Sequence, residues 1–314
     1  LLEFQECFHV HGLERAKVGG FRIPESHPGA KFALMVVFPH AKINLGLNVL
    51  RLRKDGYRDI ETVMVPIPLF DMLEVIPASG SGTDDHFLSH SGRSVPGDPA
   101  QDLCLRAVHR LSREVPVPAL RLHLHKVIPT GAGLGGGSSD CAFTLMLVNR
   151  MLGSPLDKGR LHALAAELGS DVPFFLENGP QLVTGRGELL RPLPVELSAY
   201  WLLLVAPGIH VSTAAAYAGT TPTGAPMPLL EVLSSSPPKD WSPRVHNTME
   251  QSVFTAHPEL RSLVDRLVAH GADHAAMSGS GSSVFGIFKE RPTPLALGPG
   301  HEQWVLPLDQ RKRA

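Results

Sequence analysis

Five glycines fall within seven residues in the stretch Val127-Ile128-Pro129-Thr130-Gly131-Ala132-Gly133-Leu134-Gly135-Gly136-Gly137-Ser138-Ser139-Asp140. An alternating strand-like run, residues 120–128, leads into this stretch, and an apolar helix-like run, residues 142–152, follows it. Glycines allow backbone N–H groups to converge on an anion, and a helix N-terminus adds unpaired donors and the positive end of its dipole. Ser138, Ser139 and Asp140 are residue types that cap a helix at its start. The stretch therefore predicts a phosphate-binding loop.

Two other phosphate loops and a purely structural turn are the alternatives. A Walker A loop needs a lysine directly after its glycines, and none is present here. Gly131, Gly133 and Gly136 fit the dinucleotide fingerprint Gly-x-Gly-x-x-Gly, but a second strand with an acidic end must follow it. Residues 156–168 have a helical pattern in that place. Five glycines and two serines at a helix start are more than a structural turn requires.

Two further stretches agree with the glycine loop in order and spacing. They are Pro39-His40-Ala41-Lys42-Ile43-Asn44-Leu45-Gly46-Leu47 and Met277-Ser278-Gly279-Ser280-Gly281-Ser282-Ser283-Val284-Phe285. Together the three stretches resemble the three motifs of the GHMP kinases. Asp55-Gly56-Tyr57 and Gly169-Ser170-Asp171-Val172-Pro173-Phe174-Phe175 add a narrower resemblance, to the 4-diphosphocytidyl-2-C-methyl-D-erythritol kinases. The resemblance covers about residues 35–288, which is most of the chain.

The resemblance implies a two-domain α+β fold with the active site in the cleft between the domains. It implies a ribosomal protein S5 domain 2-like N-terminal domain over residues 35–195, which binds ATP, and an α/β C-terminal domain over residues 196–314. Strands and helices that mix without strict alternation favour the α+β class independently. Residues 1–34 have an irregular composition, and Met35 lies where family members begin. We expect this extension to be disordered or non-native, and dispensable.

The resemblance also implies an activity. It is the ATP-dependent phosphorylation of a hydroxyl of 4-diphosphocytidyl-2-C-methyl-D-erythritol to the 2-phosphate, in the methylerythritol phosphate route to isoprenoid precursors. ATP with Mg²⁺ is the cofactor that this chemistry implies. One alternative is a GHMP kinase for another small alcohol, of the homoserine or mevalonate type. The other is a catalytically silent nucleotide-binding module.

Lys42 and Asp171 are the candidate catalytic residues. Lys42 lies between Ala41 and Ile43 in an apolar strand, which predicts an enclosed ammonium that needs a partner. Asp171 opens an unusually apolar run. We expect Asp171 to accept or orient the hydroxyl proton, and Lys42 to compensate its charge and approach the γ-phosphate. A helix cap at Asp171 and a surface position for Lys42 are the alternatives from the residues alone, and the matching family positions favour the catalytic pair.

The ATP site is expected to comprise Pro129 to Ser139 together with Asp102, which lies where relatives often have Asn near the adenine. Ser139 is also the candidate Mg²⁺ ligand. The third-motif loop contributes Ser278, Gly279, Ser280 and Gly281.

The acceptor site is expected to comprise Asn44, Tyr57, Arg58 and Tyr217. Both tyrosines match family positions whose rings stack on a cytosine, and ordinary packing is the alternative. Asn44 has an amide that can bind polar groups of the acceptor. Arg58 replaces the family's usual His, and a guanidinium cannot accept a hydrogen bond as an imidazole can. The residue pattern thus leaves recognition of the base at Arg58 open.

The chain has 314 residues, of which 43% are hydrophobic and 19% charged, as in an ordinary globular protein of one or two domains. A net charge of −1 gives no global field that favours nucleic acid or acidic membranes. No apolar run reaches the length of a transmembrane helix. Cys7, Cys104 and Cys141 predict neither a disulfide framework nor a zinc site, which fits a reducing cytoplasm. A monomer or homodimer is expected.

Four secondary-structure expectations bear on the fold. Residues 78–97 are polar and glycine-rich, which predicts a surface excursion, and residues 221–243 are rich in Pro and Ser, which predicts a loop. A helix is expected over residues 139–152, after the glycine loop. His123 and His125 alternate with leucines, which predicts a polar strand face in preference to a metal site.

Overall fold

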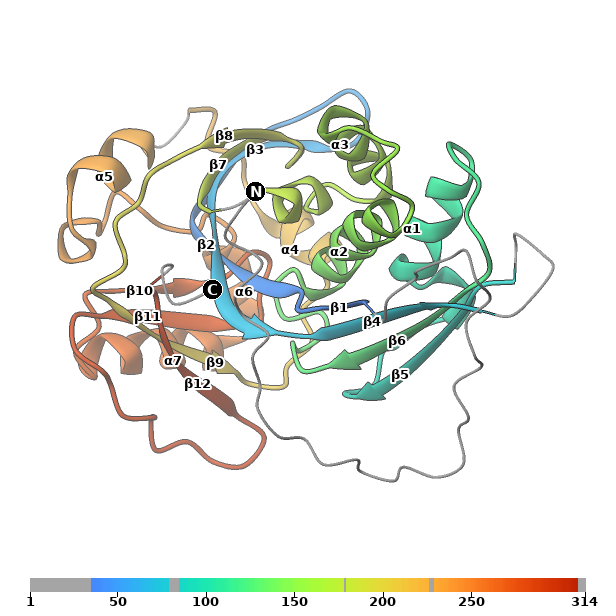
Figure 1. Cartoon of the computed structure of the whole chain (residues 1–314). Helices are drawn as coiled ribbons and strands as arrows, with labels where there is room; N and C mark the ends of the chain where they lie inside the picture. The colour runs from blue at the N-terminus through green and yellow to red at the C-terminus, as the bar shows by residue number, and fades with distance from the viewer. Residues whose placement is uncertain (1–34, 79–84, 178, 226–228, 310–314) are drawn as a thin grey trace.

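The computed structural model describes residues 35–78, 85–177, 179–225 and 229–309. The expectation for residues 1–34 lies outside these ranges. The described chain forms three four-stranded sheets with helices packed between and around them (Figure 1). The mixture of helices and sheets is that of the expected α+β class.

One sheet has the order β2-β3-β7-β8 and is antiparallel throughout. Its strands are β2 (His40–Leu52), β3 (Arg58–Phe70), β7 (Gln181–Gly185) and β8 (Leu189–Pro192). The sheet carries the first motif on β2. The β2–β3 hairpin turns at Gly56, which has φ +82° and whose N–H donates to the Arg53 carbonyl at 3.2 Å. Asp55 and Gly56 therefore lie in the turn of this hairpin.

A second sheet has the order β1-β4-β6-β5. Its strands are β1 (Met35–Val37), β4 (Met72–Pro77), β6 (Leu120–Lys126) and β5 (Phe87–Gly92). The expectation of a surface excursion over residues 78–97 is wrong in part, because residues 87–92 form β5, which pairs in parallel with β6; residues 79–84 lie outside the described ranges. Serine and histidine side chains concealed this strand: Ser91 Oγ lies 2.8 Å from His123 Nε2 and 2.9 Å from His125 Nδ1. The polar strand face expected at His123 and His125 is confirmed.

Three helices share one apolar core with this second sheet: two pack against the sheet, and the third packs against the other two (Figure 1). They are α1 (Leu103–Ser112), α2 (Gly136–Met151) and α3 (Lys158–Leu168), with the short 3₁₀ helices η1 (Pro99–Gln101) and η2 (Val172–Leu176) beside them. The expected start of α2 is wrong. Gly135, with φ +72°, takes the N-cap position, and Ser138 to Asp140 lie inside the first turns. A left-handed glycine ends the loop without a side-chain cap, so the N-terminal N–H groups of α2 are left for another partner.

The third sheet has the antiparallel order β10-β11-β9-β12. Its strands are β10 (His274–Met277), β11 (Val284–Phe288), β9 (Trp201–Ala206) and β12 (Glu302–Pro307), and its helices are α4 (Thr213–Gly219), α6 (Glu250–Ala256) and α7 (Pro258–Ala269). The expectation of a loop over residues 221–243 is wrong in part. It contains α5 (Leu229–Ser235) and the 3₁₀ helix η3 (Pro238–Asp240). Leu229, Val232 and Leu233 supply a buried face between the Pro and Ser residues.

One hydrophobic cluster joins the first sheet to the third. It contains Val63 of β3, Leu202 of β9 and Phe285 of β11, all fully buried. Val195 and Leu197, which flank the expected domain boundary, belong to the same cluster. The boundary between residues 195 and 196 stays a prediction. In the described part of the chain every helix is too short or too polar to span a bilayer.

Candidate active site

A cleft of about 350 Å³ lies where the glycine loop, β2, α4 and the third-motif loop meet. Its wall contains the ten residues from Pro129 to Ser138, together with Lys42, Asn44, Asp171, Tyr217, Gly279 and Ser280. Residues from four separate motifs, far apart in the chain, thus face one space. The lining does not include Asp102, Ser139, Tyr57 or Arg58.

The glycine loop and the third-motif loop interlock at Gly133. A Cβ atom at Gly133 would lie 2.0 Å from the Ser278 carbonyl oxygen, and Gly133 has φ +76°. The Ser278 hydroxyl donates to the Gly133 carbonyl at 2.9 Å, and the Ser283 N–H donates to the Ala132 carbonyl at 3.1 Å. Only glycine fits this approach, so the glycine at this position holds the two loops in register.

Lys42 is buried in β2, directly beneath the glycine loop. Its backbone N–H donates to the Leu134 carbonyl at 2.9 Å, and a Cβ at Gly135 would lie 3.1 Å from its Cγ and Cε atoms. Its ammonium donates to Asn44 Oδ1 at 2.6 Å and lies 3.6 Å from Asp171 Oδ2. Burial lowers the pKa of Lys42, and the Asp171 carboxylate opposes that shift. A surface position for Lys42 is excluded by its burial.

Asp171 precedes η2, yet its side chain makes no capping hydrogen bond. Its carboxylate instead faces the cleft, with about a third of the side chain exposed, and pairs with the Lys42 ammonium. The apolar residues that follow, Val172 to Phe175, are buried and fix the backbone that carries it. An accessible carboxylate beside a buried ammonium is an arrangement that can take a proton from a hydroxyl.

Tyr217 and Asn44 form the side of the cleft next to this pair. Burial raises the pKa of Tyr217 to about 12, and the charge on Asp171 adds to the shift, so the phenol stays neutral. The Asn44 amide is satisfied by the protein: it accepts from Lys42 and donates to Thr62 Oγ1 at 3.0 Å. Asn44 therefore holds Lys42 in place, in addition to any contact with a ligand.

Tyr57 and Arg58 lie at the β2–β3 hairpin, outside the cleft wall. Tyr57 is 52% exposed, which is unusual for a large aromatic side chain. An Arg58 Nη1 group lies 3.5 Å from the Thr220 carbonyl, just after α4. Arg58 therefore links the hairpin to the segment that carries Tyr217.

Asp102 and Ser139 are placed behind the cleft wall. Asp102 caps α1: its Oδ1 accepts the Cys104 N–H at 2.8 Å, and its Oδ2 lies 3.0 Å from His90 Nε2. Its neighbour Leu103 lines the cleft. Ser139 is fully buried, and its hydroxyl has no hydrogen-bond partner within the described chain. The roles expected for both residues stay predictions.

Comparison with known proteins identifies the family. The GHMP kinases N terminal domain model matches residues 102–179, and the GHMP kinases C terminal model matches residues 238–297. A 4-diphosphocytidyl-2-C-methyl-D-erythritol kinase of Cytophaga hutchinsonii is 44% identical over 259 residues, which cover 82% of this chain and 94% of the relative. The chain belongs to the 4-diphosphocytidyl-2-C-methyl-D-erythritol kinase family of GHMP kinases. A relative of the same name from Parabacteroides distasonis is also 44% identical, over 82% of this chain and 93% of its own.

Solved structures agree with this assignment of the GHMP kinase fold. The crystal structure of a 4-(cytidine 5′-diphospho)-2C-methyl-D-erythritol kinase superposes with a TM-score of 0.69 at 33% identity, and covers 87% of this chain and 98% of that chain. A homoserine kinase from Cytophaga hutchinsonii superposes with a TM-score of 0.60 at 17% identity, over 80% of this chain and 85% of that chain. The second match shows the fold alone.

Lys126 is the main cleft residue of this GHMP kinase that the motifs did not predict. At the end of β6, its buried ammonium donates to Asp140 Oδ2 at 2.6 Å and to Asp71 Oδ2. Asp71 Oδ1 accepts the N–H groups of Val127 and Ile128, at 2.6 and 2.9 Å. Burial opposes the charge on Lys126, but the two carboxylates outweigh it and raise the pKa of the ammonium.

The Lys126 cluster ties together the two ends of the glycine loop. Asp71 holds the backbone that enters the loop, and Asp140 belongs to the helix that leaves it. Burial raises the pKa of Asp140, and the neighbouring Lys126 ammonium opposes that shift. A lysine five residues before the first loop glycine, with an aspartate three residues after the last one, was the signal available in the sequence. Thr213 is a second lining residue that the motifs did not predict, and its hydroxyl oxygen lies 3.0 Å from the hydroxyl oxygen of Ser280.

Proposed function

We propose that this kinase transfers the γ-phosphoryl group of ATP to a hydroxyl of 4-diphosphocytidyl-2-C-methyl-D-erythritol to give the 2-phosphate, in the methylerythritol phosphate route to isoprenoid precursors. Relatives of that name align over most of the chain. The observation that carries the chemistry is the Lys42–Asp171 pair, 3.6 Å apart, in a cleft whose wall is a glycine loop. A silent module would not need a carboxylate that faces the cleft beside a buried ammonium.

The glycine loop and the N-terminus of α2 bind the phosphates. The left-handed glycines Gly131, Gly133 and Gly135 turn the backbone so that N–H groups face one anion. Lys42 places a positive charge next to the transferred group, where negative charge develops. Asp171 takes the proton of the attacking hydroxyl. Lys42 stabilises the deprotonated carboxylate, which is the form that accepts this proton.

Mg²⁺ neutralises phosphate charge in this type of reaction. The described residues contain no group of three or more His, Cys, Asp or Glu side chains placed to hold a metal ion. This fits Mg²⁺, which keeps several waters and binds mainly to substrate phosphates. The Ser139 hydroxyl is buried in the first turn of α2, behind the cleft wall, and has no hydrogen-bond partner in the described chain, so it is a side-chain oxygen that would hold such an ion. We assign Ser139 that role.

The acceptor binds on the side of Tyr217, Tyr57 and Arg58. Tyr217 has a neutral, mostly buried ring at the cleft wall next to Asp171. Tyr57 has an exposed ring on the neighbouring hairpin, which Arg58 connects to Thr220. One aromatic ring at the cleft wall and a second on the neighbouring hairpin suit a planar base, and the pyrimidine of the cytidylyl group is that base.

Replacement of either tyrosine by alanine should weaken acceptor binding selectively. For Tyr217→Ala and Tyr57→Ala we expect the acceptor KM to rise by the equivalent of about 1–3 kcal/mol, because each ring stacks on the base. The KM for ATP should change by less than about twofold. Arg58→His, which restores the family's residue, should leave the acceptor KM unchanged or lower it. Steady-state kinetics with each substrate varied in turn measure these effects, and equal increases for both substrates would point to a distorted cleft.

A screen of acceptors tests the function itself. ATP consumption should be fastest with 4-diphosphocytidyl-2-C-methyl-D-erythritol, and much slower with 2-C-methyl-D-erythritol, homoserine or mevalonate, because these lack the base that the tyrosines bind. Mass spectrometry and ³¹P NMR of the product should show one added phosphate on the tertiary carbon oxygen. Faster turnover of an acceptor without cytidine would refute the proposal.

We propose that the reaction takes place in the cytoplasm and that the enzyme is a monomer or homodimer. Cys104 and Cys141 are buried and unpaired. Burial raises the pKa of both thiols, which suits cysteines that serve packing in a reducing compartment.

A further inference from the structure

The turn between β7 and β8 lies beside the ring of Tyr57. Strands β3 and β7 pair with Ile60 opposite Gly185, so the residues that lead into β3 run alongside the turn that follows β7. At this turn the Arg186 guanidinium lies 4.9 Å from the centroid of the Tyr57 ring. This is a distance at which a cation is attracted to the face of an aromatic ring.

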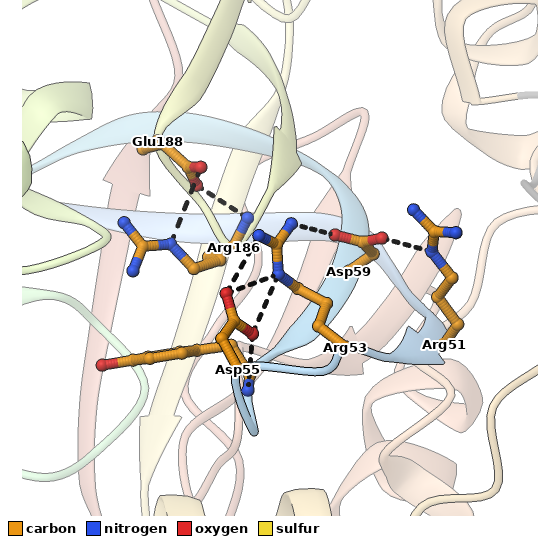
Figure 2. A network of polar contacts seen from close by, with 7 residues as sticks. Arg51, Arg53, Asp55, Asp59, Arg186 and Glu188 are labelled. Carbon is orange, nitrogen blue, oxygen red and sulfur yellow. Dashed lines mark hydrogen bonds and ion pairs between the residues drawn. The ribbon is translucent and has the colours of Figure 1, made fainter.

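Polar contacts hold the segments that carry both residues, and Figure 2 shows the Arg53–Asp55 and Arg186–Glu188 contacts among them. The Tyr57 backbone accepts from Arg53 N at 2.8 Å and donates to Asp55 Oδ1 at 3.2 Å, and the Arg53 guanidinium binds the Asp55 carboxylate. On the other hairpin, the Arg186 backbone N–H donates to Glu188 Oε2 at 2.7 Å, and the guanidinium Nε lies 3.7 Å from Glu188 Oε1. The backbone that carries each side chain is therefore held in place, and less of it has to be ordered on binding.

The pair leaves surface for a ligand on both members. An aromatic ring has two faces, the guanidinium covers one, and Tyr57 is still 52% exposed. Within the described chain, the Arg186 guanidinium makes an ion pair with Glu188 at 3.7 Å but donates no hydrogen bond. Its N–H groups are therefore available to phosphate oxygens, which a guanidinium binds well.

The same turn touches the segment that carries Asp171. Gly187 has φ +125°, and a Cβ at this position would lie 3.2 Å from Ser170 Cβ and 3.3 Å from the Ser170 carbonyl oxygen. Ser170 directly precedes Asp171. One short turn is thus packed against both the exposed tyrosine and the backbone of the proposed base.

We propose that Arg186 is a specificity-determining residue for the nucleotide part of the acceptor. Its guanidinium backs one face of the Tyr57 ring, the base of a pyrimidine nucleoside diphosphate stacks on the other face, and the remaining guanidinium N–H groups meet the diphosphate. The inference rests on the proposed function, since it assigns a residue to the acceptor that the function requires.

Substitutions at Arg186 test this assignment. In Arg186→Ala the acceptor KM should rise about threefold to tenfold, while kcat and the ATP KM stay within twofold, because the residue acts on the acceptor only. Arg186→Lys should lie in between, since it keeps the charge and loses the planar group. Arg191→Ala, an exposed arginine on β8 of the same hairpin, is the matched control and should behave as wild type. Calorimetric titration with cytidine 5′-diphosphate should show the same order of affinities.

A double-mutant cycle separates stacking from general damage to the turn. Arg186→Ala should add less than twofold to the acceptor KM in a Tyr57→Ala background, because the ring through which it acts is gone. Wild-type phosphorylation of the cytidylyl acceptor combined with an unchanged or lower acceptor KM in Arg186→Ala overturns the inference and leaves the proposed function standing. No phosphorylation of that acceptor by the wild type overturns both.

Discussion

Asp171→Asn should lower kcat by roughly 10²–10⁴-fold while ATP still binds with a near-normal KM, because general base catalysis contributes an effect of that size. Asparagine keeps the shape of the side chain and removes the group that accepts the proton. The change also removes the carboxylate that faces the buried Lys42 ammonium at 3.6 Å. Single-turnover kinetics on folded protein measure the chemical step directly.

Asp157→Asn is the matched control for this substitution. The Asp157 side chain caps α3 by accepting the Arg160 N–H at 2.7 Å, whereas Asp171 caps nothing. Asparagine caps a helix about as well as aspartate, so Asp157→Asn should keep both its melting temperature and its kcat. A near-wild-type kcat in Asp171→Asn would mean that the carboxylate does not accept the hydroxyl proton, and it would refute the proposed mechanism.

Lys42→Met should lower kcat by about 10²–10³-fold, the cost of losing one preorganised donor at a site of developing charge. Methionine keeps much of the apolar stem against Gly135, so the buried strand should fold normally. Circular dichroism and the melting temperature check the fold, and initial rates with saturating ATP give kcat. A fall in ATP affinity alone, with kcat unchanged, would assign Lys42 to nucleotide binding and not to the transfer.

The double variant tests whether the two residues act on one event. Lys42 and Asp171 form one ion pair, so losses at the two positions should not multiply. Lys42→Met/Asp171→Asn should lose far less than the product of the two single losses. Fully multiplicative losses would indicate independent roles.

The order of the motifs predicted most residues of the cleft wall. Residues at the ends of paired strands and in glycine loops can occupy few positions once the strands pair. Tyr57 and Arg58 were expected at the acceptor, and they lie outside the cleft wall near the tip of the β2–β3 hairpin, whereas Ile60, farther along β3, belongs to the wall. Their distance from the cleft wall depends on the orientation of the β2–β3 hairpin relative to the rest of the fold. No local sequence pattern determines that orientation. Arg186 had no signal, since its contact with Tyr57 exists only because β3 and β7 pair.

The errors in the fold have specific physical causes. Strand β5 is stabilised by a parallel ladder and by Ser–His hydrogen bonds, so its residues show none of the hydrophobic alternation that reveals a half-buried strand. Helix α5 is short, and its three buried residues lie among Pro and Ser residues that dominate the composition. Helix α2 begins at Gly136 because a left-handed Gly135 replaces the expected side-chain cap. In each case a tertiary contact outweighed a local preference.

The approach of Gly133 to Ser278 limits how this enzyme can be recombined with its relatives. The Ser278 carbonyl oxygen, in the C-terminal half of the chain, occupies the space beside Gly133 in the N-terminal half. Any larger residue at position 133 would place its Cβ 2.0 Å from that oxygen. The two loops must therefore be exchanged together, although 145 positions separate Gly133 from Ser278. A chimera that takes its C-terminal half from a distant GHMP kinase must bring a loop of the same shape. Grafting the glycine loop alone would replace only one of two loops whose shapes must match.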